Sequence, residues 1–464
     1  MRLHSLTSRV LWIIASSAIA LSSSMTSFGQ TVKTVLNFDG TNGAYPVNSA
    51  LVQGRDGHLY GTTTGDGITT FGTIFRFKPS GEGSTLYRFN GSEGIGPAGG
   101  VTLVSDGNFY GTTQAGGTFG EGTLFRVSPG GQLAVLYNFT GGADGGVPLS
   151  APIEGSDGNL YGTTVSSSTG TAGTIYKYSA GKLTTIYSFD TAHGYFPVGL
   201  VQGTDGYLYA STALGGTYGF GSYLKVSTSG ILKNTHALRG SAYGPAGALV
   251  QGSDGNLYGA LDGGGLYKKG AIGLLNQTTG LLSTLFSLGA NSSDGTSPSG
   301  ALVQGVDKSF YGVTVGGGQR SAGVIFEFTS AGTYSELFSF IPPSNGLGVL
   351  PYTLKQHTTG EFFGVTVVGG AKGLGSIYSL EVGVGPFLSL QKYQGKLGST
   401  TQILGQGLTG VTNVTYNGVP ATAFEVVSDT YMTAVVPLGA SSGSIVVTTP
   451  TGSLQTDKTF IIRK

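Results

Sequence analysis

Short runs that alternate apolar and polar residues fill most of the chain, and they recur in groups of four. In one group, an apolar run at residues 50–53 is followed by Asp-Gly and by a second run at residues 59–63. Alternating runs at residues 72–77 and 84–89 complete the group. A period of two is typical of strands, and Asp-Gly between two such runs indicates a hairpin turn. The pattern therefore predicts an all-β chain built from four-stranded units.

The four-strand unit occurs seven times. Its anchor is the aromatic residue of the second run, and successive anchors lie 48 to 53 residues apart. These anchors are Tyr60, Tyr110, Tyr161, Tyr209, Tyr258, Tyr311 and Phe363. A period in this range indicates a solenoid, a propeller or an array. A proline also precedes the first run of every unit, and because proline lacks an N–H group we expect it in the connection before that strand.

The order of the runs distinguishes a closed ring from an open array. The run at residues 31–38 is of the fourth type and has no earlier run before it, whereas the last unit ends with a third-type run at residues 375–380. A ring explains this offset, because the first strand then pairs with the last sheet and leaves no long exposed edge. We therefore predict a seven-bladed β-propeller of four-stranded blades over residues 30–384, with the N-terminal strand closing the last blade. The alternative is an open array with a ragged start.

Two resemblances extend this interpretation. The repeated motif SDGNLYGTT, with a Gly-Gly pair and G-T-[IL]-[FY]-[KR] after it, resembles the repeat of bacterial choice-of-anchor tandem repeat GloVer-containing proteins. That resemblance covers residues 31–383 and implies export and surface association. Beyond the repeats, residues 403–408, 414–421 and 434–437 resemble the IPT/TIG domain. This implies an Ig-like β-sandwich over residues 385–464, a module that serves elsewhere as a spacer, an adhesion module or an accessory to carbohydrate-active domains.

The N-terminus is typical of an export signal. Arg2 and Arg9 precede an apolar stretch at residues 10–21, and the small residues Ser27 and Gly29 fit a cleavage site. We expect a signal peptide at residues 1–29, with an N-terminal membrane anchor as the alternative. The protein is then secreted, extracellular or held in the cell envelope, with no stable membrane insertion after the signal is removed.

The composition and the residue spacing argue against several kinds of functional site. The chain has no cysteine, which excludes disulfides, thiolate metal sites and a cysteine nucleophile. Its formal net charge is +1 and it has no basic run, so we expect no nucleic-acid partner. The repeated turn aspartates lack the spacing of a calcium loop, and the histidines lack the spacing of a zinc site. We expect the aspartates to form turns, and we assign no catalytic residue, no metal and no cofactor.

The candidate binding surface comes from the topology. Loops between the second and third strands, and between successive blades, open on one face of a propeller, and here they carry the residues that do not repeat. The predicted ligand-binding residues are Phe119, Glu121, His193, Tyr195, Tyr218, Phe220, Tyr243 and Arg320. Aromatic rings among Gly, Thr and Ser suit sugars.

We interpret the protein as a non-catalytic binding or adhesion protein that presents this face to an extracellular glycan or protein. The alternatives are a polysaccharide lyase or hydrolase with its site at the channel mouth, and a purely structural surface protein. The sequence carries no signal for an oligomeric state.

Overall fold

The structure is a computed structural model that describes residues 30–67, 69, 71–165, 172–239, 244–341 and 347–463. These residues form strands and no helix, which makes the chain all-β. Among them, no helical segment is present that could cross a membrane. The predicted signal peptide at residues 1–29 and the predicted site residue Tyr243 lie outside the described residues.

Seven four-stranded antiparallel sheets follow one another along the chain, and we number them 1 to 7. Sheet 1 contains β2 (Val52–Gln53), β3 (Leu59–Thr63), β4 (Thr73–Phe77) and β5 (Gly83–Arg88); sheet 2 contains β6 (Ile95–Leu103), β7 (Phe109–Ala115), β8 (Thr123–Val127) and β9 (Leu133–Asn138). Sheet 3 contains β10 (Ile153–Glu154), β11 (Leu160–Thr164), β12 (Thr174–Ser179) and β13 (Lys182–Ser188); sheet 4 contains β14 (Tyr195–Gln202), β15 (Leu208–Leu214), β16 (Ser222–Val226) and β17 (Leu232–Ala237). Sheet 5 contains β18 (Val250–Gln251), β19 (Leu257–Leu261), β20 (Ala271–Leu275) and β21 (Leu282–Ser287); sheet 6 contains β22 (Gly295–Gln304), β23 (Phe310–Gly317), β24 (Val324–Phe328) and β25 (Tyr334–Ser339). Each of these six sheets keeps its strands in chain order.

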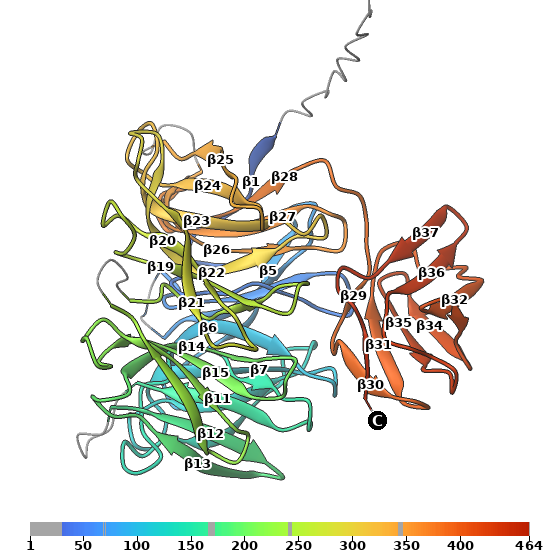
Figure 1. Cartoon of the computed structure of the whole chain (residues 1–464), viewed down its shortest axis with the longest axis horizontal. Coiled ribbons are helices and arrows are strands. Elements are labelled where there is room, and N and C mark those ends of the chain that lie inside the picture. Colours follow the sequence, from blue (N-terminus) through green and yellow to red (C-terminus); the bar gives the residue numbers. More distant parts are fainter. Residues whose placement is uncertain are drawn as a thin grey trace, which may run out of the picture.

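Sheet 7 combines the two ends of the repeat region. It contains β26 (Val349–Gln356), β27 (Phe362–Val368) and β28 (Ser376–Glu381), and its fourth strand is the N-terminal β1 (Thr31–Asn37). β1 pairs antiparallel with β28, from Thr31 opposite Glu381 to Asn37 opposite Ser376. Figure 1 shows these two strands side by side. The pairing that the order of runs predicted is therefore present.

Apolar side chains pack between neighbouring sheets rather than within one sheet. Seven buried clusters each contain residues of two consecutive sheets, and one of them joins sheet 7 to sheet 1. In that cluster Phe363 and Ile377 of sheet 7 pack with Leu59, Phe75 and Phe77 of sheet 1. Each four-stranded sheet has two apolar faces, so it needs a neighbour on both sides to keep them from water. The fold is β-propeller-like, and the same packing continues across its two ends.

A contact between glycine and proline repeats at the joints between sheets. The glycine just before the third strand has positive φ, and a Cβ on Gly375 would lie 2.8 Å from Cδ of Pro46. The equivalent distance is 2.6 Å for Gly72 and Pro97, so the joint between sheets 7 and 1 resembles the joint between sheets 1 and 2. Only glycine fits this backbone and this space.

The position of the repeated prolines differs from the prediction in four sheets. Pro97, Pro197, Pro298 and Pro351 lie inside the first strand, not in the connection before it. The first strand is an edge of its sheet, with one neighbour only, so a residue without an N–H group removes no ladder bond on the open side. The edge position explains why these strands extend back through the proline.

Backbone and side-chain hydrogen bonds also join the sheets. A glutamine or glutamate at the end of the first strand accepts a hydrogen bond from a backbone N–H in the turn of the preceding sheet, at six of the seven joints. The acceptors and donors are Gln53 and Thr358, Glu154 and Ser105, Gln202 and Ser156, Gln251 and Thr204, Gln304 and Ser253, and Gln356 and Val306, with distances of 2.7 to 3.0 Å. We call these contacts the glutamine clamps. At the remaining joint Leu103 takes the position, and Arg55 Nη2 donates to the Ser105 carbonyl instead, at 2.8 Å.

The C-terminal unit, residues 385–463, has a separate core. One sheet contains β29 (Ser389–Leu390), β31 (Thr400–Leu404), β35 (Tyr431–Val435) and β34 (Phe424–Ser428); the second contains β33 (Val419–Pro420), β32 (Asn413–Tyr416), β36 (Ile445–Thr449) and β37 (Gly452–Gln455); β30 (Gln394–Lys396) pairs with β38 (Ile461–Arg463). Side chains of both four-stranded sheets, among them Ile403, Met432, Tyr416 and Val447, form one buried cluster.

Candidate functional site

The two ends of the sheets differ in what they carry. In an antiparallel sheet of four consecutive strands, the second-to-third connections and the connections to the next sheet open at the same end, which we call the loop face. The tight turns between first and second strands, and between third and fourth strands, lie at the opposite end, which we call the turn face. The C-terminal unit lies against the turn face (Figure 1), so the loop face is free of it.

Residues that lead into the first strands share an unusual backbone conformation on the loop face. The residue before each repeated proline has positive φ in all seven repeats. These residues and angles are Tyr45 (57°), Gly96 (62°), Val147 (51°), Phe196 (58°), Gly244 (29°), Ser297 (53°) and Leu350 (57°). A bulky residue rarely adopts this conformation. Here a backbone hydrogen bond stabilises this conformation; for example, the Tyr45 N–H donates to the Leu374 carbonyl of the preceding sheet at 2.8 Å.

Exposed apolar side chains collect on the loop face. Among the described residues of the seven repeats, eleven large apolar side chains are exposed, and nine belong to loop-face connections or strand ends. The nine are Tyr45, Phe119, Phe196, Leu214, Tyr218, Leu266, Tyr267, Ile341 and Leu350. The other two, Ile231 and Leu281, lie in turns at the opposite end. Exposed apolar surface gathered on one face is typical of an interaction site.

Of the predicted site residues, the aromatic ones fall into two groups. Phe119 and Tyr218 are 59% and 48% exposed, and the Arg239 guanidinium lies 5.9 Å from the centre of the Tyr218 ring. Tyr195 and Phe220 are half-buried and pack against the clusters that join sheet 4 to its neighbours. Only the exposed pair can offer most of a ring face to a ligand.

The polar site residues are also in different surroundings. Glu121 is half-buried, and its carboxylate side chain covers Gly141 and Gly146, where an added Cβ would lie within 3 Å of it. His193 Nδ1 lies 2.8 Å from Asp190 Oδ2, a contact inside one turn. The equivalent turn before sheet 1 closes in the same way: the Asn42 N–H donates to Asp39 Oδ1 at 3.2 Å, as the His193 N–H donates to Asp190 Oδ1 at 2.7 Å. Arg320 is exposed in the loop between β23 and β24.

The structure brings these residues together only in part. His193, Tyr195, Tyr218 and Phe220 all belong to sheet 4 or its loops, whereas Phe119 and Glu121 belong to sheet 2 and Arg320 to sheet 6. No group of three or more His, Asp or Glu residues that could hold a metal ion is present in the described parts of the chain.

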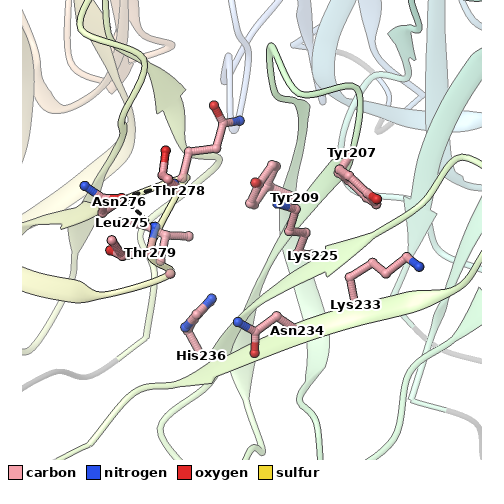
Figure 2. A pocket seen from close by; sticks show the side chains of 12 residues that line it. Tyr207, Tyr209, Lys225, Lys233, Asn234, His236, Leu275, Asn276, Thr278 and Thr279 are labelled. Carbon is pink, nitrogen blue, oxygen red and sulfur yellow. Dashed lines mark hydrogen bonds between the residues drawn. The ribbon is translucent and has the colours of Figure 1, made fainter.

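A second candidate, which the sequence did not predict, lies between sheets 4 and 5 at the turn face. A groove of about 220 Å³ lies between β16 and β17 of sheet 4 and the turn after β20 of sheet 5, and Figure 2 shows the side chains that line it. We call it the Lys233 groove. Its lining includes Tyr207, Lys225, Lys233, Asn234, His236 and Thr278. The available signal was Tyr207, which stands in the turn position that Asn108, Asn159 and Asn256 occupy elsewhere.

Charge and burial set the chemistry of this groove. Lys225 Nζ lies 2.8 Å from Asp205 Oδ2 and 4.6 Å from the centre of the Tyr207 ring. Burial favours the neutral amine, but the contacts with Asp205 and Tyr209 together outweigh it and raise the pKa of Lys225. Burial and the nearby Lys225 charge lower the pKa of His236, which is therefore neutral at pH 7. The groove presents ammonium groups, a neutral imidazole, an amide and an aromatic ring.

A third hollow lies beneath the C-terminal unit. Turns of sheets 3, 4 and 5, residues 391–394, and Lys458, Thr459 and Ile461 line a cavity of about 640 Å³. Direct contacts hold the C-terminal unit around it. Lys392 Nζ lies 2.8 Å from Glu154 Oε1, the Arg55 guanidinium lies 4.6 Å from the centre of the Tyr431 ring, and Arg463 Nη2 donates to the Thr204 carbonyl at 2.6 Å. The cavity is thus bounded by a direct interface between the two parts of the chain.

The repeated sheets, their shared core and their closed order define a β-propeller-like all-β repeat protein. Residues 21–224 and 197–426 match the family model of the Gloeobacter/Verrucomicrobia repeat, and the chain belongs to that family. A search of curated proteins finds no match.

Solved structures with similar folds share little sequence with this chain. Oligogalacturonate lyase from Vibrio parahaemolyticus aligns with a TM-score of 0.51 and 14% identity, over 75% of this chain and 93% of that one. The extracellular domain of a hybrid two-component system from B. thetaiotaomicron aligns with a TM-score of 0.50 and 12% identity, over 88% of this chain and 50% of that one. At these identities the similarity concerns the fold alone.

Proposed function

We propose that this protein is an exported, non-catalytic binding protein that holds an extracellular glycan on its loop face. In this proposal the seven sheets are the blades of a seven-bladed propeller, and residues 385–464 are an Ig-like sandwich of the IPT/TIG type. Residues 1–29 are its signal peptide, and the protein is of the choice-of-anchor kind, secreted or held in the cell envelope. The sequence motifs support export and surface association.

One observation carries the binding function, namely the concentration of exposed apolar side chains on the loop face. Nine of the eleven in the described repeats lie there, on loops of several different sheets. Folding alone gives no reason to leave Phe119, Tyr218 and Leu266 at 59%, 48% and 75% exposure on one face. The turn face carries two such side chains and faces the C-terminal unit.

The aromatic character of many exposed side chains on the loop face favours a glycan over other ligands. Tyr45, Phe119, Phe196, Tyr218 and Tyr267 present rings from separate loops, among Gly, Thr and Ser residues. Sugar rings have apolar faces that stack on aromatic rings, and their hydroxyls bond to nearby polar groups. Separate rings around a rim suit successive units of a polymer. A protein is the other kind of ligand that such a face can bind.

A glycan array with mature protein, residues 30–464, tests the proposal. We expect binding to at least one extracellular polysaccharide, and we expect the F119A/Y218A variant to bind at least tenfold more weakly, since loss of each stacked ring costs about 0.5–1.5 kcal/mol or more. The I231A/L281A variant is the matched control, because it removes two exposed apolar side chains from the opposite end. Both variants change exposed residues, so both should fold.

The proposal fails if no glycan binds, if the F119A/Y218A variant binds as tightly as the unchanged protein, or if the control variant loses binding equally. Turnover of a bound polysaccharide would favour the lyase or hydrolase alternative. Capture of a defined cell-surface protein that depends on Phe119 and Tyr218, without glycan binding, would favour a protein ligand.

A further inference from the structure

We propose that the Lys233 groove is a second binding site, specific for a sugar residue that carries a carboxylate. It lies between sheets 4 and 5 near the turn face, whereas the proposed glycan surface lies on the loop face. The two sites therefore use different residues, and either can exist without the other.

Lys233 supplies the charge for a carboxylate. Lys225 already has an acidic partner in Asp205, at 2.8 Å. Lys233 is exposed, and it forms no ion pair with any other residue that the structure describes. An ammonium group at the rim of a partly enclosed groove is well placed to attract an anionic ligand and then pair with it.

Neighbouring side chains add the contacts that a sugar requires. The Asn234 side-chain oxygen accepts a hydrogen bond from the Thr235 N–H at 2.8 Å, which leaves the Asn234 NH₂ group for a ligand oxygen. His236 is neutral and can donate or accept a hydrogen bond to a hydroxyl. Tyr207 supplies an aromatic ring on the same side of the groove as Lys233, as Figure 2 shows. A carboxylate, hydroxyls and an apolar ring face are combined in a uronic acid unit.

The space is made by a glycine. Gly280, in the turn between β20 and β21, faces His236, and a Cβ at this position would lie 2.9 Å from His236 Cε1 and 3.2 Å from Asn234 Nδ2. Any larger residue would press on the His236 side chain and narrow the groove. Its volume of about 220 Å³ is below the roughly 300–1,000 Å³ of pockets that enclose whole drug-sized ligands. The groove therefore fits one sugar unit of a chain.

Ligand-detected NMR titrations with methyl glucuronide and methyl glucoside, a pair that differs by the carboxylate, test this proposal on the mature protein. We expect the glucuronide to bind at least tenfold more tightly than the glucoside. The K233E variant should weaken glucuronide binding at least tenfold. The Y207N variant, which restores the residue of three other repeats, should weaken it severalfold through lost ring contact.

Two control variants show whether glucuronide binding depends on this groove. The K182E variant reverses an exposed lysine on β13, the equivalent strand of sheet 3, and should leave glucuronide binding unchanged. The F119A/Y218A variant should also leave it unchanged, so the loop-face proposal and this one fail independently. Equal affinity for glucuronide and glucoside, an unaffected K233E variant, or equally tight competition by inorganic sulfate would overturn the proposal; the last result would indicate a general anion site.

Discussion

At the residue scale, the repeated turn depends on two residues that work as a pair. In each of the first six repeats, the tyrosine hydroxyl donates to the carboxylate of the aspartate four positions earlier, as from Tyr258 to Asp254 at 2.8 Å. The same aspartate accepts a backbone N–H two positions on, which confirms its predicted turn role. In the seventh repeat both residues change together, to Thr359 and Phe363.

In the seventh repeat, a histidine side chain forms hydrogen bonds within the turn and to the first sheet. His357 is fully buried, its Nε2 donates to the Gly57 carbonyl at 3.0 Å, and its Nδ1 accepts the Thr359 N–H at 3.2 Å. A second proton would break the contact with Thr359 and place a charge in the interior. Burial accordingly lowers the pKa of His357 to about 4.

We predict that His357 makes stability depend on pH. Its pKa is lower in the folded protein than the ordinary 6.5, so its contribution is complete above pH 6.5 and is lost as pH falls toward 4. The shift corresponds to a loss of about 3 kcal/mol across this window. Urea unfolding at several pH values measures it. The H357Q variant should flatten the dependence, whereas H58N should leave it unchanged; an equal slope in H357Q and the unchanged protein would contradict the prediction.

At the element scale, the glutamine clamps are contacts between sheets that the sequence of a single repeat does not predict. The sequence places a glutamine at the end of several first strands, as in Ala-Leu-Val-Gln at residues 248–251. Its hydrogen-bond partner lies in the preceding sheet, so no pattern within one unit indicates it. The Lys233 groove was missed for the same reason, because its residues come from two sheets. In contrast, strand order and turn chemistry are local, and the sequence was sufficient to predict them.

The clamps should carry measurable stability. Gln356 is 5% exposed; its side-chain oxygen accepts the Val306 N–H at 2.9 Å and its amide donates to the Gly360 carbonyl at 3.0 Å. We predict that Q356L, which copies the natural Leu103, lowers the free energy of unfolding by about 1–3 kcal/mol, since two net hydrogen bonds are lost. Chemical denaturation measures this. Q132L, at an exposed glutamine, is the control, and equal effects of the two variants would refute the clamp role.

At the scale of the whole molecule, closure depends on one strand. The sequence predicted it from an offset in the order of runs, and β1 pairs with β28 accordingly. The contacts of the C-terminal unit could not be predicted, because Arg55 and Gln391, for example, are more than 300 positions apart in the chain. Some repeat residues at this interface do depart from the common pattern, as with Glu154, where five of the other six repeats have glutamine.

A disulfide across this pairing should stabilise the protein more than a local one. The T31C/E381C variant links two directly paired residues and closes a loop of nearly the entire repeat region. R76C/S84C links paired residues of one hairpin and is the matched control. A chain-entropy estimate favours the long loop by roughly 3 kcal/mol. We expect a higher Tm for the first variant under oxidising conditions and a lower Tm for protein that lacks residues 31–39; no difference in either test would contradict closure.

The interface with the C-terminal unit constrains how the repeat array can evolve. Its partners stand at fixed angular positions: Arg55 in the first repeat, Glu154 in the third and Thr358 in the seventh. Gain or loss of one repeat by recombination would rotate at least one of these residues away from its counterpart. The C-terminal unit can therefore bind only an array with this number of repeats. Selection for its attachment would keep the number of repeats constant while the loop sequences diverge.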